Sequence, residues 1–250
     1  MNYNLDQLAD RQLREQLSLF LNSVVEKSGD NLKAVLLYGG IAKNDYTPGK
    51  SNVNMLFVLE SIDLNVLDQL SLIFQKGISD FRLSPFMLTS GEIVPSSDVF
   101  AVKLFDMQQH HLLLYGTDFL QDLSFDPKHL KFISEQELAN QLSRMKYFYI
   151  RNFDLPEQLL LKIKSGFTTL LITANTYFFL KNKVYYHTRK EIIEHLLNEP
   201  GMDQADLREL LNIKEDVMEL SPEKIKSAYD KLMVQYKQLI KAFKQIQFHD

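Results

Sequence analysis

Two short apolar runs constrain the fold of this chain more than any other feature. Residues 32–38 have the sequence LKAVLLY and residues 53–59 have the sequence VNMLFVL. The first run ends at Gly39 and Gly40, and a Pro-Gly turn signal interrupts the segment between the two runs. Apolar runs of this length between turn residues predict buried β-strands. The chain therefore contains two strands that are covered on both faces.

Helical periodicity surrounds these runs. Apolar residues recur three and four positions apart over Leu5–Lys27 and over Leu64–Phe81, which predicts a helix in each segment. A short strand is expected at Pro85–Leu88, a turn or short helix near Glu92, and a further strand at Val99–Met107. The order helix, strand, strand, helix, strand, strand predicts a mixed sheet covered by helices, within the α/β or α+β class.

The pattern changes after about Tyr115, where strand signals stop and long helical periods begin. Residues 156–183 form one such period. A second follows the Ser-Pro-Glu sequence at residues 221–223, which matches an N-cap, a proline in the first turn and an early acid. We therefore expect two domains, an α/β domain at residues 1–123 and a C-terminal helical bundle at residues 124–250.

The composition excludes several classes of function. The chain has 250 residues, no cysteine and a formal net charge of −4. Disulfide and thiolate chemistry is therefore excluded, and a nucleic-acid partner is not expected. The longest uncharged apolar stretch, Ser165–Leu180, is too short and too polar to cross a bilayer, and the polar N-terminal segment does not resemble a secretory signal. We expect a cytoplasmic protein with no membrane partner; the sequence predicts no oligomeric state.

The segment Leu32–Glu60 resembles the core of the nucleotidyltransferase superfamily, which includes the aminoglycoside nucleotidyltransferases and the polymerase-β-like enzymes. In that family an apolar strand ends in a glycine pair, and a second strand opens with two aspartates one residue apart. The same frame here holds Asn52 and Asn54. The resemblance is weaker over Val99–Asp118, and beyond that it extends only to the order of an α/β domain and a helical bundle.

The resemblance implies a metal site whose charges this chain lacks. The family moves a nucleoside monophosphate from a triphosphate to a hydroxyl, and its aspartates hold two Mg²⁺ ions. Alternate residues of a strand point to one face, so Asn52 and Asn54 keep the geometry without the charges. We therefore expect no metal and no cofactor. Either the two amides only hydrogen-bond to a turn and nearby backbone, or they line a ligand pocket.

A third carboxylate is implied by the same resemblance, on a neighbouring strand. If Val99–Met107 is that strand, Lys103 occupies the position, and alternation points Asp106 to the opposite face. An ammonium at Lys103 either replaces the charge of a metal and holds a phosphate, or is a solvated lysine at the sheet edge. The solvated lysine is the expected outcome.

The glycine pair is a candidate phosphate site. By resemblance, Gly39 and Gly40 let phosphates approach backbone N–H groups, and a tight strand-to-helix turn explains the same residues. Lys43 is expected to face solvent, with a phosphate contact as the alternative. His110 and His111 are expected to be helix neighbours that point apart, so neither is assigned a metal. The candidate nucleotide-binding residues are therefore Gly39, Gly40, Lys43, Asn52, Asn54 and Lys103.

The expected function is that of a divergent member of this superfamily. We expect it to have lost metal-dependent transfer and to bind a nucleotide or small molecule in the cleft between its domains. Two alternatives stay open. In the first, the chain is an active nucleotidyltransferase that uses Mg²⁺ and other carboxylates, such as Asp45 or Asp106, to modify a small-molecule hydroxyl. In the second, it is a structural or interaction protein whose cleft is filled.

Overall fold

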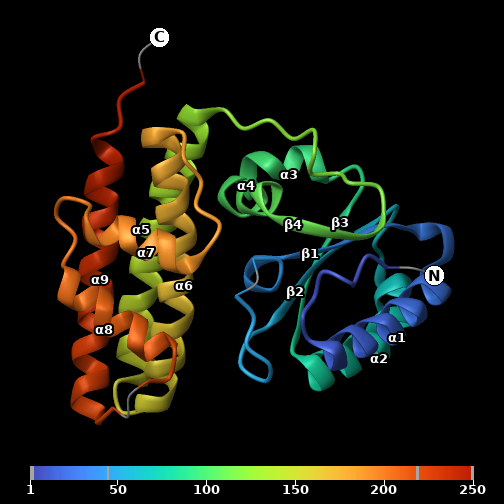
Figure 1. The fold of residues 1–250 in the computed structure, drawn as a ribbon, viewed down its shortest axis with the longest axis horizontal. Coiled ribbons are helices and arrows are strands. Elements are labelled where there is room, and N and C mark those ends of the chain that lie inside the picture. Colours follow the sequence, from blue (N-terminus) through green and yellow to red (C-terminus); the bar gives the residue numbers. More distant parts are fainter. Residues whose placement is uncertain (1–2, 44, 218–219, 249–250) are drawn as a thin grey trace. The chain divides into compact units, whose positions relative to one another are not determined.

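The computed structural model describes residues 3–43, 45–217 and 220–248. Its internal contacts divide the chain into two compact units, Met1–Phe125 and Asp126–Asp250. In the described residues, all strands belong to the first unit, and the second unit is built from helices and their connections (Figure 1).

The first unit contains both strands and helices. Its elements are, in chain order, α1 (Arg11–Ser28), the 3₁₀ turn η1 (Gly29–Asn31), β1 (Leu32–Tyr38), the 3₁₀ turn η2 (Gly39–Ile41), β2 (Val53–Leu59), α2 (Leu64–Phe81), β3 (Leu83–Thr89), α3 (Ile93–Val99), α4 (Ala101–Gln109) and β4 (His111–Gly116). The strand order is β3-β2-β1-β4. β1 is antiparallel to both of its neighbours, and β2 is parallel to β3, so the sheet is mixed as predicted.

Helices cover both faces of this sheet (Figure 1). On one face, Val35 and Phe57 belong to the same buried cluster as the apolar sides of α1 and α2. On the other face, Leu36 and Leu56 share a buried cluster with Leu104 of α4. Because both faces of β1 and β2 are buried, the two strands are apolar throughout and do not alternate with polar residues.

The bounds of β1, β2 and α2 are those predicted, but the first helix starts later than its periodicity suggested. α1 begins at Arg11 because the Asp10 side chain accepts a hydrogen bond from the Leu13 backbone N–H and caps the helix. Leu5 and Leu8 are still buried in the same core, but they lie in a non-helical segment. The spacing of Leu5 and Leu8 therefore predicted their burial correctly, but the helix that it predicted for them was wrong.

The predicted strand at Val99–Met107 is wrong. This segment is the helix α4, and the last strand is β4, which the sequence analysis did not predict. A short run of mixed apolar and polar residues fits the period of a strand and that of a helix. Here Ala101, Leu104 and Met107 recur every three residues, and the helix places all three in the interior. The consequence is that Lys103 and Asp106, placed on opposite faces by a strand, lie close to the same side of a helix.

The second unit confirms the predicted helical bundle. Its helices are α5 (Pro127–Asn152), α6 (Pro156–Asn182), α7 (Arg189–Leu197), α8 (Gln204–Lys214) and α9 (Pro222–Lys244). Two buried tyrosines of α9 join the three long helices, because Tyr229 donates to the Met145 carbonyl of α5 and Tyr236 donates to the Gly166 carbonyl of α6, each at 2.8 Å. Across the described residues, no helix has both the length and the apolar character that crossing a bilayer requires.

The pairing of β4 with β1 gives a direct test of this topology. Gly116 pairs with Ala34 at a φ of 78°, and a Cβ on Gly116 would overlap the Lys33 carbonyl oxygen. Gly116→Ala should therefore destabilise the first unit by at least about 2 kcal/mol in urea unfolding followed by circular dichroism. The matched control is Gly91→Ala, where a Cβ meets open space and stability should not fall. Equal stability of the two variants would contradict the observed end of β4.

Candidate functional site

A row of polar side chains crosses the sheet at one end. Tyr38 of β1 is paired with Asn54 of β2 and with His111 of β4, and Asn54 is paired with Ser84 of β3. All four residues are partly buried. By the alternation of each strand they lie on the face that α3 and α4 cover. We call Tyr38, Asn54, Ser84 and His111 the end row.

The glycine pair borders the end row for a steric reason. Gly39 has a φ of 73°, and a Cβ there would lie 2.8 Å from the Asn54 side-chain nitrogen. A Cβ on Gly40 would lie 3.0 Å from the Asp45 carbonyl oxygen, and the Gly40 carbonyl accepts a hydrogen bond from the Asp45 N–H. The close turn therefore accounts for both glycines without a ligand. It also brings the Asn54 amide against the backbone of the loop.

The two asparagines have different surroundings. Asn54 is partly buried in the end row, whereas Asn52 is exposed and lies just before β2. The Asn52 amide oxygen accepts a hydrogen bond from Arg82 Nε at 3.3 Å. Of the two candidate residues, Asn54 is therefore the one that belongs to a partly buried polar surface.

Lys43 does not face solvent, contrary to expectation. Its Nζ lies 2.7 Å from Asp106 Oδ1, and the two side chains are only 10% and 6% exposed. The loop after β1 brings Lys43 to α4, where the carboxylate of Asp106 compensates its charge in the interior. Burial, and next the charge of Asp106, raise the pKa of the Tyr38 hydroxyl above its usual value. Tyr38 therefore stays a neutral hydrogen-bonding group.

Lys103 is also more buried than a solvated edge lysine. Its Nζ lies 3.5 Å from the centre of the Phe86 ring and 5.7 Å from that of Tyr38, so two aromatic faces hold the cation above the sheet. Burial lowers the pKa of Lys103 to about 8. Within the described ranges, no acidic side chain forms an ion pair with it. Lys103 is thus a partly desolvated cation beside the end row.

The tandem histidines are not neighbours on a helix, because His110 follows α4 and His111 begins β4. His110 Nε2 lies 2.6 Å from the Ala42 carbonyl. His111 lies between the Met107 carbonyl at Nδ1 and Asp118 Oδ2 at Nε2, each at 2.8 Å. These contacts occupy both ring nitrogens of His111 and give the residue a role in holding β4 to α4.

The side chains at the end row do not fit a pair of Mg²⁺ ions. Magnesium prefers charged oxygen ligands, whereas Asn52 and Asn54 are neutral and Asp106 already forms an ion pair with Lys43. On the β3 side of β2, the residue paired with Asn54 is Ser84, which is also neutral. In the parts of the chain that the structure describes, no three His, Cys, Asp or Glu side chains come together as a metal site.

Comparison with known proteins supports the fold. No protein-family model and no curated protein matches the sequence. Among solved structures, the chain is similar to the spectinomycin adenyltransferase AAD(9) from Enterococcus faecialis, whose structure contains ATP and spectinomycin. The TM-score is 0.61 at 9% identity, and the match covers 89% of this chain and 99% of that chain. The fold is nucleotidyltransferase-like. At this identity the likeness concerns the fold alone.

The sequence analysis missed Tyr38 and Ser84. Tyr38 is the last residue before the glycine pair, so its position at a strand end was visible. Ser84 lay just outside the predicted strand, and its pairing with Asn54 follows from a parallel register that no local pattern reports. Asp106 and Lys43 were both considered, but nothing in their spacing of 63 positions indicated that they touch.

The Lys43–Asp106 pair predicts a large asymmetry between single and double variants. Lys43→Met leaves a buried carboxylate next to an apolar group, so it should destabilise the first unit by about 3 kcal/mol. Adding Asp106→Leu should restore much of that loss, since no uncompensated charge then remains. Urea unfolding of the single and double variants measures the coupling. Lys76→Met, on the exposed side of α2, is the control and should be nearly neutral. Additive single losses would argue against a direct pair.

Proposed function

We propose that this chain binds a phosphate-bearing small molecule, such as a nucleotide, at the end row without Mg²⁺. We further propose that it does not catalyse metal-dependent nucleotidyl transfer. The observation that carries the proposal is Lys103, a partly desolvated cation beside the end row that has no acidic partner among the described residues. An ammonium in this position is suited to hold an anionic oxygen directly.

The surroundings of Lys103 favour an anion over a cation. Asn54, Ser84 and Tyr38 each carry a hydrogen-bond donor and no formal charge, and Lys43 compensates the charge of Asp106. A phosphate therefore meets an ammonium and neutral donors. The nucleotide class is taken from the protein of similar fold that was solved with ATP.

The absence of transfer is proposed on the chemistry of the amides. In the family that the sequence resembles, two Mg²⁺ ions stabilise the attacking and the leaving oxygen. Amide oxygens at Asn52 and Asn54 leave the charge of such ions uncompensated. Asp106 would have to break a buried ion pair to contribute a carboxylate. The end row can thus orient a phosphate-bearing ligand, but it offers no charged group to hold the metals.

Calorimetric titration tests both parts of the proposal. ATP, GTP, CTP and UTP should be titrated with Mg²⁺ and with a chelator, and at least one should bind equally in both. Lys103→Met should weaken that binding at least about tenfold, because one charge-assisted hydrogen bond is lost. Lys76→Met removes an exposed charge and should leave affinity unchanged. Binding seen only with Mg²⁺ would contradict the proposal, as would transfer of a nucleoside monophosphate to any acceptor. No binding in either condition would favour an interaction protein.

The same titration has a predicted pH dependence. Lys103 holds an anion as an ammonium, and burial lowers its pKa to about 8 in the free protein. Affinity should therefore be greatest below pH 8 and fall as the pH rises through that value. Tyr38 does not supply this change, since its raised pKa keeps its hydroxyl neutral over this range. In Lys103→Met the fall between pH 7 and pH 9 should disappear.

Restoring the carboxylates tests the alignment of the site. Asn52→Asp with Asn54→Asp returns the two charges, and Ser84→Asp adds a third carboxylate opposite residue 54. The triple variant should bind Mg²⁺ more tightly than the double variant, because residues paired across two strands have neighbouring side chains. Titration with Mg²⁺ measures the difference. A triple variant that binds Mg²⁺ no better than the double variant would show that residue 84 does not face the site.

A further inference from the structure

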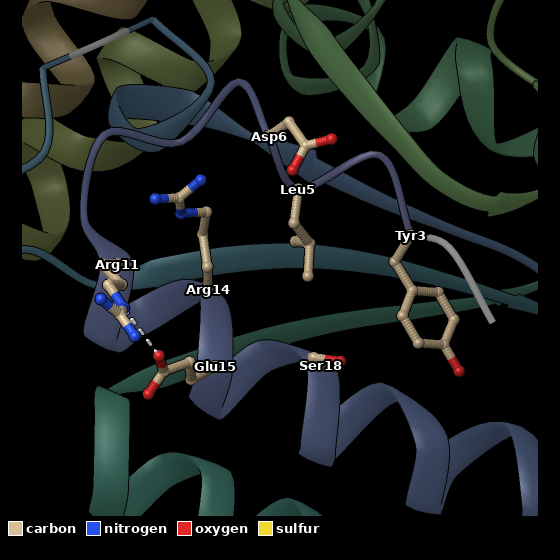
Figure 2. A pocket seen from close by; sticks show the side chains of 7 residues that line it. All are labelled: Tyr3, Leu5, Asp6, Arg11, Arg14, Glu15 and Ser18. Carbon is tan, nitrogen blue, oxygen red and sulfur yellow. Dashed lines mark hydrogen bonds and ion pairs between the residues drawn. The ribbon is translucent and has the colours of Figure 1, made fainter.

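A second candidate site lies on the opposite side of the sheet from the end row. The segment before α1 passes over the first turns of that helix and borders an open cavity of about 520 Å³ (Figure 2). Its apolar wall is made by Tyr3 and Leu5, which belong to the core cluster under α1 and α2. The volume falls within the range of small-molecule pockets in proteins.

Arg14 is the unusual residue in this cavity. Its Nε is buried and has no hydrogen-bond partner, and within the described residues the guanidinium forms no ion pair. The side chain as a whole is only partly buried. Arginine stays protonated and carries five donors, and a buried donor without a partner is costly. The other arginine of the cavity differs, because exposed Arg11 is paired with Glu15 through Nε and Oε1 at 3.0 Å. Figure 2 shows Arg14 rising from α1 toward the segment that carries Leu5 and Asp6.

The acidic residues of the cavity complete a pattern of charges. Glu15 is occupied by Arg11, whereas Asp6 is exposed and forms no ion pair within the described part of the chain. Arg14 and Asp6 come from different elements and flank the apolar wall (Figure 2). The formal charges of the four charged side chains in the lining sum to zero. A neutral lining does not favour a multiply charged anion.

We propose that this cavity binds a small zwitterion of the size of an apolar α-amino acid. Its carboxylate accepts hydrogen bonds from the Arg14 guanidinium, whose planar fork matches the two carboxylate oxygens. Its ammonium lies toward Asp6, and its apolar side chain packs on Tyr3 and Leu5. A ligand of this kind compensates the charge of the guanidinium and adds no net charge to a neutral lining. The site does not depend on the nucleotide proposed at the end row.

Calorimetry on the full chain with four matched probes tests this assignment. L-leucine carries both charges, 4-methylpentanoate lacks the ammonium, 3-methylbutylamine lacks the carboxylate, and inorganic phosphate lacks the apolar body. Leucine should bind, and each of the other three should bind at least about tenfold more weakly, because each loses a charged contact or the apolar one. Phosphate binding more tightly than leucine, or no leucine binding at about 10 mM, would overturn the proposal.

Variants assign the two charged contacts. Arg14→Gln should abolish leucine binding, and Asp6→Asn should weaken leucine without affecting 4-methylpentanoate. Arg208→Gln, an exposed arginine of α8, is the control and should bind leucine like the parent. Without ligand, the melting temperature of Arg14→Gln should equal or exceed that of the parent, since an unsatisfied donor has been removed. A lower melting temperature, or unchanged leucine binding, would identify Arg14 as a structural residue.

Discussion

The buried ion pair between Lys43 and Asp106 is the interaction on which the end of the sheet depends. Neither charge is stable in the interior alone, and a separation of 2.7 Å lets each compensate the other. The pair joins the loop after β1 to α4, two elements that are far apart in the chain. Because Lys103 precedes Asp106 by three positions on the same helix, the pair also holds Lys103 above Tyr38 and Phe86.

This arrangement reverses the electrostatics expected of a two-metal site. A site for Mg²⁺ concentrates negative charge on a few oxygens and relies on the ions to attract phosphate. Here the amides carry no charge, the one buried carboxylate described beside the row is compensated, and Lys103 supplies positive charge directly. In this nucleotidyltransferase-like fold, the end row is thus a neutral polar surface that lies beside a positive charge.

The elements predicted well were those whose signals are local. β1, β2 and α2 are long apolar or periodic segments with turn residues at their ends, and their predicted bounds hold. The long helix α6 was predicted equally well, because its apolar residues recur at helical spacing from Pro156 to Asn182. The prediction failed at Val99–Met107, where a short segment fits two periods and only packing against the sheet decides between them. Because this segment was assigned to a strand, Lys103 was expected to be a solvated lysine at the sheet edge, whereas it is partly buried on α4.

The sequence by itself determined the chemical identity of the central residues: two amides where the resembling family has acids, and a glycine pair at the end of an apolar strand. It also determined the order of an α/β unit and a helical unit, since periodicity is a property of neighbouring residues. Only the tertiary structure decided that Ser84 faces Asn54 and that Lys43 is buried against Asp106. It also decided that Arg14 lines a cavity and that its Nε has no hydrogen-bond partner in the described residues. These facts depend on strand register and on contacts between distant segments, and a linear pattern of residue types does not specify either one.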